Sequence, residues 1–224
     1  MSSHHVVREK QEPALILANG ESCRLELLQD LLEWSPFIVV LDGAIERVLE
    51  LGIKVDVLLG DFDSKKIDIG QIQEDQYPIQ IVHTPNQDKT DLEKAIEYLI
   101  ERGFPAANIL WATGRRADHN LANITNIVRY KSKIQLAVID DYSVIYPLSP
   151  LPNKFEKWYA AGFPISLLPV GIAKGVTTKN LAYTIDNENL TLGYKVGNSN
   201  EVKQDGLIHV SFESGDLLLM ECKD

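Results

Sequence analysis

Cysteine is scarce in this sequence, which contains two, Cys23 and Cys222, among 224 residues. A chain of this length does not depend on a disulfide framework, and two cysteines so far apart are typical of reduced thiols. Residues 1–13, MSSHHVVREKQEP, lack the apolar core of a signal peptide, and no apolar run approaches membrane-spanning length. These absences predict a cytoplasmic protein that does not enter a membrane.

Positive charge is also in short supply. The chain has 22 Lys and Arg against 32 Asp and Glu, which gives a formal net charge of -10. Because no basic cluster or tail offsets this excess, the field of the protein repels nucleic acid and anionic membranes. We therefore expect a small-molecule substrate and no nucleic-acid partner. An anionic substrate such as a nucleotide would need local cations, and a divalent metal is their simplest source.

The two familiar glycine-rich phosphate loops are missing as well. The sequence contains neither a Walker A lysine motif nor a Gly-x-Gly-x-x-Gly turn. Both loops cradle phosphates with backbone amides beside a helix. A nucleotide site in this chain would therefore need a metal ion and arginine side chains in their place.

Hydrophobic residues make up 45% of the chain, enough to form a substantial core. In the first part, short apolar runs alternate with helical patterns, which predicts strands and crossover helices of a parallel sheet. The predicted strands are 14–18, 37–41, 55–59, 79–82, 109–112 and 136–139, and the predicted helices are 21–33, 44–51, 91–102 and 121–130. Residues 1–148 are therefore expected to form an α/β domain with a Rossmann-like parallel sheet and flanking helices.

After about Ser149 the pattern changes to alternation of period two with turn residues between the runs. Residues 207–212 and 217–220 read as antiparallel strands, and 183–185 with 190–192 read as a further hairpin. Two prolines in the segment 149–153 mark a natural boundary. We therefore predict a second domain, residues 149–224, that folds as an all-β sandwich.

Two carboxylates follow the predicted strand 55–59, where open α/β sheets bind ligands. On an extended chain Asp61 and Asp63 project to one side and Phe62 to the other, while Gly60 lets the backbone turn closely beside them. Their oxygens form a hard site suited to Mg²⁺. A turn rich in Asp and Ser is the alternative interpretation.

A second acidic cluster occupies residues 88–91, before a predicted helix. Thr90 and Glu93 predict a capping box, so the helix dipole alone explains Asp91 at the first helical position. It does not explain Asp88, which precedes the cap. Four carboxylates at neighbouring strand ends would repel one another unless a cation lay among them, which favours a metal site.

A third polar cluster, Gly-Arg-Arg-Ala-Asp-His at 114–119, precedes a predicted helix that carries Asn123. Arginine offers phosphate oxygens a planar fork of donors. Asp118 either caps the helix or serves the chemistry, and His119 is either a loop residue or a group that titrates near neutrality. Residues 42–43 add a fourth polar loop at the same edge of the predicted sheet.

Three segments together resemble the thiamine pyrophosphokinase family: DGAIERVLELGIKVDVLLGDFDS at 42–64, QDKTDLEKAI at 87–96 and GRRADHNLANI at 114–124. The resemblance continues into the second domain through ISLLPVG at 165–171, KGVTTKNLAYTI at 174–185 and GNSNEV at 197–202. It therefore covers nearly the whole chain. It implies that residues 1–148 bind the nucleotide and catalyse the reaction, and that residues 149–224 bind thiamine.

The resemblance implies an ATP:thiamine diphosphotransferase. The primary hydroxyl of thiamine would attack the β-phosphorus of ATP, and thiamine diphosphate and AMP would form. Mg²⁺ would be the cofactor, ATP the co-substrate, and the protein a homodimer with its sites between subunits. Such transfers depend mainly on positioning and on cancelling charge, which a metal and an arginine can do. The acidic field would also favour thiamine, which carries a permanent positive charge.

The resemblance also implies roles for single residues. The implied catalytic residues are Asp61, Asp63 and Asp91 as metal ligands, Asp88 beside them, and Asp118 next to the reacting groups. The implied nucleotide-binding residues are Asp42, Gly43, Arg116, His119 and Asn123. The implied thiamine-binding residues are Ser199 and Asn200, with Phe163 or Trp158 as the aromatic side chain that stacks on the substrate.

Two positions in the first domain depart from the usual pattern of this family, and in the second domain Leu181-Ala182-Tyr183 stands where a bulkier or more basic stretch is commoner. Ala44 stands where Asp-Gly-Gly-Ala-Asn has its second glycine, and Arg115 stands where Gly-Gly-Arg has a glycine. Each adds a side chain where glycine would let the backbone approach a phosphate. The preferred nucleotide is therefore left open.

Two other functions fit part of the pattern. Asp61-Phe62-Asp63 resembles the nucleophile and acid of haloacid-dehalogenase-like phosphatases, with Asp140 and Asp141 as a later acidic pair. Those enzymes place the motif after the first strand, whereas here it follows the third. A non-catalytic nucleotide- or thiamine-binding module would use the same groups without turnover. The intact carboxylates at three acidic loops favour the enzyme.

Overall fold

The computed structural model describes residues 13–63 and 68–223, so residues 1–12 of the leader and Ser64 lie outside the described residues. Two compact units are present. The first contains the described residues up to Trp111 together with Lys133–Gln135, and the second contains Ala112–Ser132 and the residues from Leu136 onward. The predicted mixed α/β class is confirmed.

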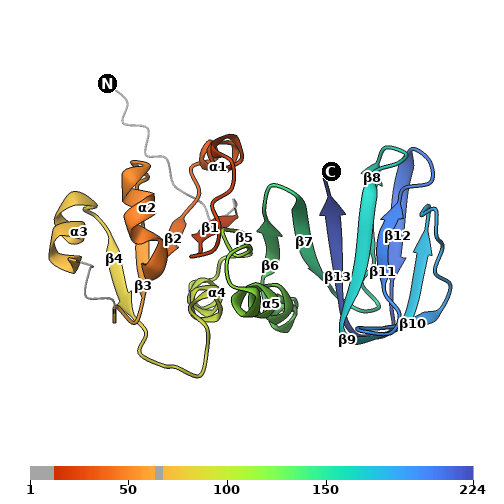
Figure 1. The fold of residues 1–224 in the computed structure, drawn as a ribbon. Coiled ribbons are helices and arrows are strands. Elements are labelled where there is room, and N and C mark those ends of the chain that lie inside the picture. Colours follow the sequence, from red (N-terminus) through yellow and green to blue (C-terminus); the bar gives the residue numbers. More distant parts are fainter. Residues whose placement is uncertain (1–12, 64–67, 224) are drawn as a thin grey trace. The chain divides into compact units, whose positions relative to one another are not determined.

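A parallel sheet forms the centre of the first unit, with the strand order β4-β3-β2-β1-β5 (Figure 1). The strands are β1 (Ala14–Leu17), β2 (Ile38–Leu41), β3 (Val57–Gly60), β4 (Gln80–His83) and β5 (Ala106–Leu110). Every residue of β1, β2 and β3 is buried, which is why these segments are continuous apolar runs. The strand order reverses between β1 and β5, so their carboxyl ends form the topological switch point where such sheets bind ligands.

The helices of the first unit follow the predicted positions in part. They are α1 (Leu25–Leu32), the short turn η1 (Asp42–Ala44), α2 (Ile45–Glu50), α3 (Ile69–Asp75) and α4 (Asp91–Glu101). The helix predicted at 21–33 begins later, after Arg24, and α3 was not predicted. In α4 the buried Leu92, Ala95, Ile96 and Leu99 recur at helical spacing, as expected for one face turned to the core.

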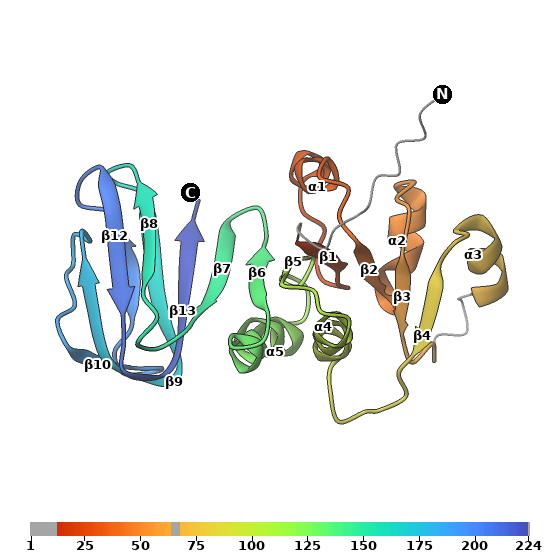
Figure 2. The same cartoon turned by 180° about the vertical axis from the view of Figure 1, so that it is seen from behind.

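The second unit is rich in antiparallel strands and begins with a helix (Figure 2). Its elements are α5 (Ala117–Asn126), η2 (Ile127–Tyr130), β6 (Gln135–Ile139), β7 (Ser143–Leu148), β8 (Phe155–Tyr159), β9 (Pro164–Lys179), β10 (Glu188–Thr191), β11 (Gly197–Glu201), β12 (Gly206–Ser211) and β13 (Ser214–Cys222). Along the 16 residues of β9, the partners are β13, β11, β10 and finally β12. The last strand, β13, lies between β7 and β9.

The predictions for the second part of the chain have mixed outcomes. The strands predicted at 207–212 and 217–220 are confirmed as β12 and β13. The hairpin predicted between 183–185 and 190–192 is wrong, because β10 pairs with β9 and residues 183–185 belong to no strand. Contacts place α5, most of β6 and all of β7 in the β-rich unit, and the domain boundary at residues 148 and 149 stays a prediction.

Cys23 and Cys222 form no disulfide. In the described ranges, no helix has both the length and the apolar character needed to cross a membrane.

Candidate functional site

Asp42 follows β2 and holds the loop that comes after β3. Its Oδ1 accepts a hydrogen bond from the amide of Gly43 at 2.6 Å, and its Oδ2 accepts one from the amide of Phe62 at 3.1 Å. A Cβ atom on Gly60 would lie 2.3 Å from the Asp42 carboxylate, so a larger residue cannot occupy that position without a shift. Asp42 and Gly60 together therefore fix where the Asp61 loop begins.

The Asp61 loop is a tight turn and does not continue β3. Phe62 has a φ of 55°, in the left-handed region, so the extended geometry predicted for residues 61–63 is wrong. The amide of Asp63 donates to Asp61 Oδ1 at 3.2 Å, which closes a turn by side chain to backbone bonding. The Phe62 ring stacks on His83 at the end of β4, with centroids 6.0 Å apart. The turn thus holds Asp61 half-buried and leaves Asp63 exposed.

Gln87, which the sequence reasoning missed, orients the Asp61 carboxylate from the loop before α4. Its Nε2 donates to Asp61 Oδ2 at 3.1 Å. This hydrogen bond is the main reason that the pKa of Asp61 is lowered, with further contributions from the Asp63 amide and the positive charge of Lys94. The position of Gln87, directly before the acidic segment 88–91, was the available signal.

The start of α4 confirms the predicted capping box. Thr90 Oγ1 accepts a hydrogen bond from the Glu93 amide, and the Glu93 carboxylate accepts one from the Thr90 amide. Asp91 Oδ1 pairs with the Lys94 ammonium at 3.0 Å, one helical turn away. Asp88 lies exposed before the cap, where its amide donates to Asn86 Oδ1 at 2.7 Å. The cap therefore fixes the backbone from which Asp91 projects.

Three of these loops come together through the hydrogen bonds from the Phe62 amide to Asp42 and from Gln87 to Asp61. Burial chiefly raises the pKa of Asp42, and the negative charges of Asp91 and Asp61 raise it further, against the hydrogen bonds from two backbone amides. A hydrogen bond from the Asp42 carboxyl group in turn lowers the pKa of Asp61. Across residues 13–63 and 68–223, no three Asp, Glu, His or Cys side chains form a ready-made metal centre. The site is a crowded acidic cluster.

A second group of polar side chains, also missed from the sequence, lies at the switch point of the sheet. Arg47 Nη1 donates to the Gly20 carbonyl at 3.1 Å and to Ser22 Oγ at 2.6 Å, and Nη2 donates to Asn19 Oδ1 at 3.4 Å. The guanidinium also lies 4.4 Å from the centroid of the Trp111 ring, after β5. Arg47 therefore holds the loop after β1. The Asn-Gly pair after a buried strand was the sequence signal.

Gly43 is tightly packed against Asn19 of this group, and Ala44 is buried in the core. A Cβ on Gly43 would meet the Asn19 amide nitrogen at 2.2 Å, so a larger residue there would require the Asn19 side chain to shift. Ala44, the first departure from the family pattern, is 1% exposed and contributes to the core. Its methyl group is therefore part of the packing.

The loop after β5 belongs to the second unit from Ala112 onward. Arg116 pairs with Asp118 through two contacts, Nη2 to Oδ2 at 2.5 Å and Nε to Oδ1 at 3.1 Å, and both side chains are exposed. The Arg116 hydrogen bond chiefly lowers the pKa of Asp118 to about 2. Arg116 is the N-cap of α5, so the interpretation of Asp118 as the cap is wrong. Arg115, the second departure, has a φ of 57°, which glycine would adopt more easily.

The other residues predicted in this loop have different surroundings. Asn123 donates from Nδ2 to the Ala112 carbonyl at 2.8 Å and so holds the loop that follows β5, while His119 is exposed. Asp140 accepts hydrogen bonds from Thr113 Oγ1 at 2.8 Å and from the Tyr142 amide at 2.9 Å. Asp140 therefore ties two loops together, a structural role rather than that of a phosphatase carboxylate.

Ser199 and Asn200 lie on β11, and only Ser199 is exposed. Asn200 is 4% exposed. Its side-chain Oδ1 accepts hydrogen bonds from the amides of Tyr183 at 3.0 Å and Glu201 at 2.9 Å, and its Nδ2 donates to the Tyr183 carbonyl at 2.7 Å. Its side chain is therefore occupied in holding the backbone. Ser199 has a φ of 53°, and its amide donates to Ser166 Oγ at 3.0 Å.

The two candidate aromatic residues differ in exposure. Trp158 on β8 is 60% exposed and lies opposite Leu207 of β12. Phe163 is half-buried, and its ring centroid lies 5.0 Å from that of Tyr159. Trp158 therefore offers an open ring face, whereas Phe163 packs against the core of the second unit.

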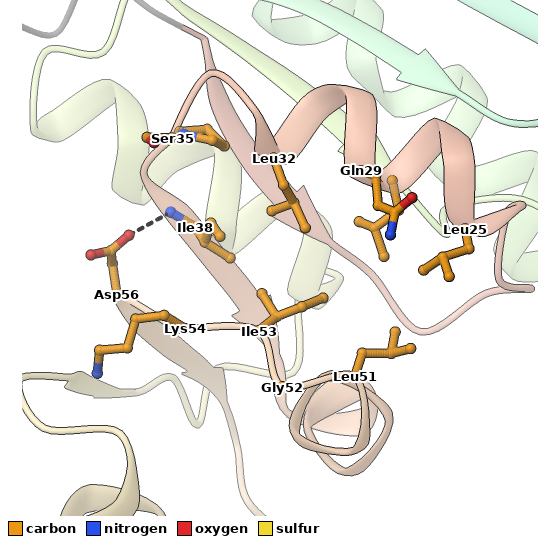
Figure 3. Close-up of a pocket in the computed structure, with 12 residues that line it drawn as sticks. Leu25, Gln29, Leu32, Ser35, Ile38, Leu51, Gly52, Ile53, Lys54 and Asp56 are labelled. Atoms are coloured by element: carbon orange, nitrogen blue, oxygen red, sulfur yellow. Dashed lines mark hydrogen bonds between the residues drawn. The ribbon is translucent and has the colours of Figure 1, made fainter.

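An apolar cavity of about 380 Å³ lies at the amino ends of the strands of the parallel sheet (Figure 3). Leu25 and Leu32 of α1, with Leu51 and Ile53 after α2, provide much of its wall. Its lining also includes Ile38 and Asp56 at the amino ends of β2 and β3, and Figure 3 shows the hydrogen bond between Asp56 and the Ile38 amide. The acidic loops follow the carboxyl ends of these strands, so the cavity is not part of the candidate site.

The fold and the site define a mixed α/β protein with an acidic site at the carboxyl edge of a parallel sheet. Residues 28–138 match the family model "Thiamin pyrophosphokinase, catalytic domain", and residues 155–217 match "Thiamin pyrophosphokinase, vitamin B1 binding domain". The chain belongs to the thiamine pyrophosphokinase family.

Individual relatives agree with the family models. The chain is 30% identical to thiamine pyrophosphokinase from Bacillus subtilis over 189 residues, which are 82% of this chain and 86% of that protein. It is 24% identical to Thiamin pyrophosphokinase 1 from Caenorhabditis elegans over 202 residues, which are 84% and 80% of the two chains. The crystal structure of the Bacillus subtilis protein superimposes with a TM-score of 0.78 and 25% identity, covering 95% of this chain and 100% of that one.

Proposed function

We propose that this protein is an ATP:thiamine diphosphotransferase, which transfers the diphosphate of ATP to the hydroxyl of thiamine and releases AMP. The observation that carries the proposal is the joining of three acidic loops, by the hydrogen bond from the Phe62 amide to Asp42 and by that from Gln87 to Asp61. These residues lie within the segment that matches the family's catalytic domain. A cluster of this kind suits a reaction whose main demand is the cancellation of phosphate charge.

Mg²⁺ fits the donor set of this cluster. The negative charges of Asp91 and Asp61 raise the pKa of Asp42, and a cation bound among these carboxyl groups would relieve that repulsion. Mg²⁺ is usually bound by one or two carboxylates together with phosphate oxygens and water, so a complete protein cage is not needed. Asp61, Asp63 and Asp91 would hold the ion, with Asp88 beside them. When bound, Mg²⁺ would neutralise charge on the diphosphate group.

The remaining polar residues of the first unit and the loop after β5 would position the nucleotide. Asp42 and Gly43 hold the acidic loop in place, and Gln87 orients Asp61. Arg116 presents an exposed guanidinium that phosphate oxygens would compete for, which would release Asp118 toward the reacting groups. His119 and Asn123 complete the proposed nucleotide-binding set.

Thiamine is proposed to bind to the second unit. Ser199 is the exposed polar residue of the pair on β11, and Asn200 would act by holding the backbone beside it. Trp158 or Phe163 would stack on the thiamine rings. An aromatic face near a cation contributes about 0.5–2 kcal/mol, and the exposed ring of Trp158 is the more available of the two.

Several features of organisation belong to the same proposal. The protein acts as a cytoplasmic homodimer with its sites between subunits. Residues 1–148 form a Rossmann-like nucleotide-binding catalytic domain, and residues 149–224 form a β-sandwich that binds thiamine. The family models support this boundary, because the first ends at residue 138 and the second begins at residue 155.

Product analysis tests the proposed reaction. The protein is incubated with thiamine, ATP and Mg²⁺, and the products are separated by chromatography. Equal amounts of thiamine diphosphate and AMP are expected. Free phosphate from ATP or from other phosphoesters would instead indicate a phosphatase. Binding of thiamine and ATP without turnover would indicate a binding module, and either of these results would overturn the proposal.

A further inference from the structure

Lys94 is a buried cation at the acidic site that neither the capping box nor the core packing explains. It lies in the first turns of α4 and is 8% exposed, whereas lysine is almost never buried unless its charge is paired. Its ammonium has two partners, the Asp91 carboxylate at 3.0 Å and the Thr84 carbonyl at 3.0 Å. Both partners belong to the loops that form the acidic cluster.

These contacts join α4 to the carboxyl edge of the sheet. Thr84 directly follows β4, and its amide donates to the Gly60 carbonyl at 2.8 Å, at the end of β3. Lys94 therefore links Asp91 to a backbone segment that is itself bonded to the start of the Asp61 loop. A hydrogen bond to a charged donor of this kind is worth more than one between neutral groups.

The charge of Lys94 is matched to its surroundings. Asp42, Asp61 and Asp91 are close enough to affect one another, and the positive charge of Lys94 also acts on Asp61. Lys89, two residues before the start of α4, has a different setting. Lys89 pairs with Glu97 at 2.8 Å, and both of those side chains are partly exposed. Lys94 is thus the buried ammonium that faces the cluster.

We infer that Lys94 is a positioning residue for the metal-dependent reaction, holding Asp91 toward the other aspartates and keeping the acidic loops together before a divalent cation binds. The inference rests on the proposed function for the identity of the reaction. It goes beyond it in assigning a task to a residue that is neither a metal ligand nor a contact of the nucleotide.

Two effects of removing Lys94 have opposite signs, which makes the inference testable. Loss of a positive charge beside the carboxylates would by itself tighten the binding of a divalent cation. Loss of a partner that orients a metal ligand typically weakens metal binding about 10–100-fold. A positioning role therefore predicts weaker binding, and a purely electrostatic role predicts tighter binding.

The test measures binding of Mn²⁺ alone to the full-length protein by electron paramagnetic resonance. Lys94→Met removes the charge and both hydrogen bonds. Lys94→Gln removes the charge but retains a donor for the Thr84 carbonyl, and it guards against a Met variant that fails to fold. Lys89→Met is the matched control, because it removes an ammonium near the same cap without a contact to Asp91. Circular dichroism checks that each variant is folded.

The expected result is Mn²⁺ affinity weakened about 10-fold or more in Lys94→Met, less in Lys94→Gln, and unchanged in Lys89→Met. In the activity assay, kcat should fall while the KM for thiamine stays constant. Unchanged or tighter Mn²⁺ binding in both Lys94 variants would overturn the inference, as would a wild-type protein that binds no Mn²⁺. If Mn²⁺ binding weakens as expected but no thiamine diphosphate forms, the proposed function fails and the role of Lys94 stands.

Discussion

The Cα atom of Gly60 lies against the Asp42 carboxylate, so closely that a methyl group added there would be 2.3 Å from it. This relationship joins the ends of two neighbouring strands, β2 and β3. The same carboxylate accepts the amide of Phe62, in the turn that carries Asp61. The geometry of the acidic site is therefore set partly by the absence of a side chain.

Gly60→Ala tests this close approach. The added methyl group must displace the Asp42 side chain, break its bond to the Phe62 amide and shift the Asp61 turn, so activity should fall at least about 10-fold. Steady-state assays of thiamine diphosphate formation measure the loss. Gly70→Ala is the control, because a Cβ there meets nothing closer than 3.4 Å and alanine favours the helix α3. A Gly60→Ala enzyme with wild-type turnover would contradict the proposed role of this contact.

Asp61→Asn and Asp63→Asn test the proposed metal ligands. Each substitution removes a negative charge from a hard oxygen site, and turnover should fall by orders of magnitude. Both residues lie at the edge of the sheet, so the urea midpoint of unfolding should barely change. Asp75→Asn is the matched control, since its carboxylate accepts a hydrogen bond from Gln71 on the surface of α3. Near-normal turnover in either variant would remove that residue from the metal site.

Tyr159→Phe tests a buried polar contact in the second unit. The Tyr159 hydroxyl donates to Glu221 Oε1 at 2.5 Å, while Lys157 pairs with the same oxygen at 2.6 Å. Burial chiefly raises the pKa of Tyr159, and the Glu221 hydrogen bond and charge raise it further. At neutral pH the variant should be less stable by about 1–3 kcal/mol, because Glu221 loses a donor.

The pH dependence of that loss follows from the same shift. Folded Tyr159 keeps its proton above pH values of about 10, where tyrosine in the unfolded chain ionises. Its contribution to the free energy of unfolding is thus complete below that pH and declines as the pH rises above it. Urea unfolding from neutral to alkaline pH should show the gap between wild type and variant narrowing. Tyr194→Phe, at a site 93% exposed, is the control. A constant gap would refute this account.

Asn200→Ala and Ser199→Ala separate a structural residue from a proposed substrate contact. Asn200 bonds three backbone groups, so its removal should destabilise the protein by about 3 kcal/mol as measured by urea unfolding. Ser199→Ala should change stability by less than about 0.5 kcal/mol and should raise the KM for thiamine. If Asn200→Ala were as stable as wild type, these hydrogen bonds would not have the role described.

Sequence patterns were sufficient to predict the features that are formed within one short segment of the chain. Strands β1 to β3 are apolar throughout because parallel strands are covered on both faces, so continuous runs located them. The Thr90 and Glu93 pair located the start of α4, since the capping box is formed within four residues. The four polar loops at the strand ends were found in the same way.

The missed features depend on contacts between distant segments or on backbone conformations that composition does not reveal. Helix α3 was overlooked because Ile72 is its one buried residue, too little for an apolar stripe. Alternation in residues 183–192 indicated which face is buried but not which strand is the partner. The left-handed conformation of Phe62 has no signal in its residue type. Gln87 and Arg47 act through partners 25 or more residues away.

The position of β13 has a consequence for how the protein is made. Residues 214–222 form a strand with partners on both sides, β7 and β9, so the sheet of the second unit remains open until these residues have left the ribosome. Strands β1 to β5 are all complete by Leu110 and have no such delay. During synthesis, the nascent chain thus presents an open strand edge, which is prone to pairing with other chains, until β13 closes it.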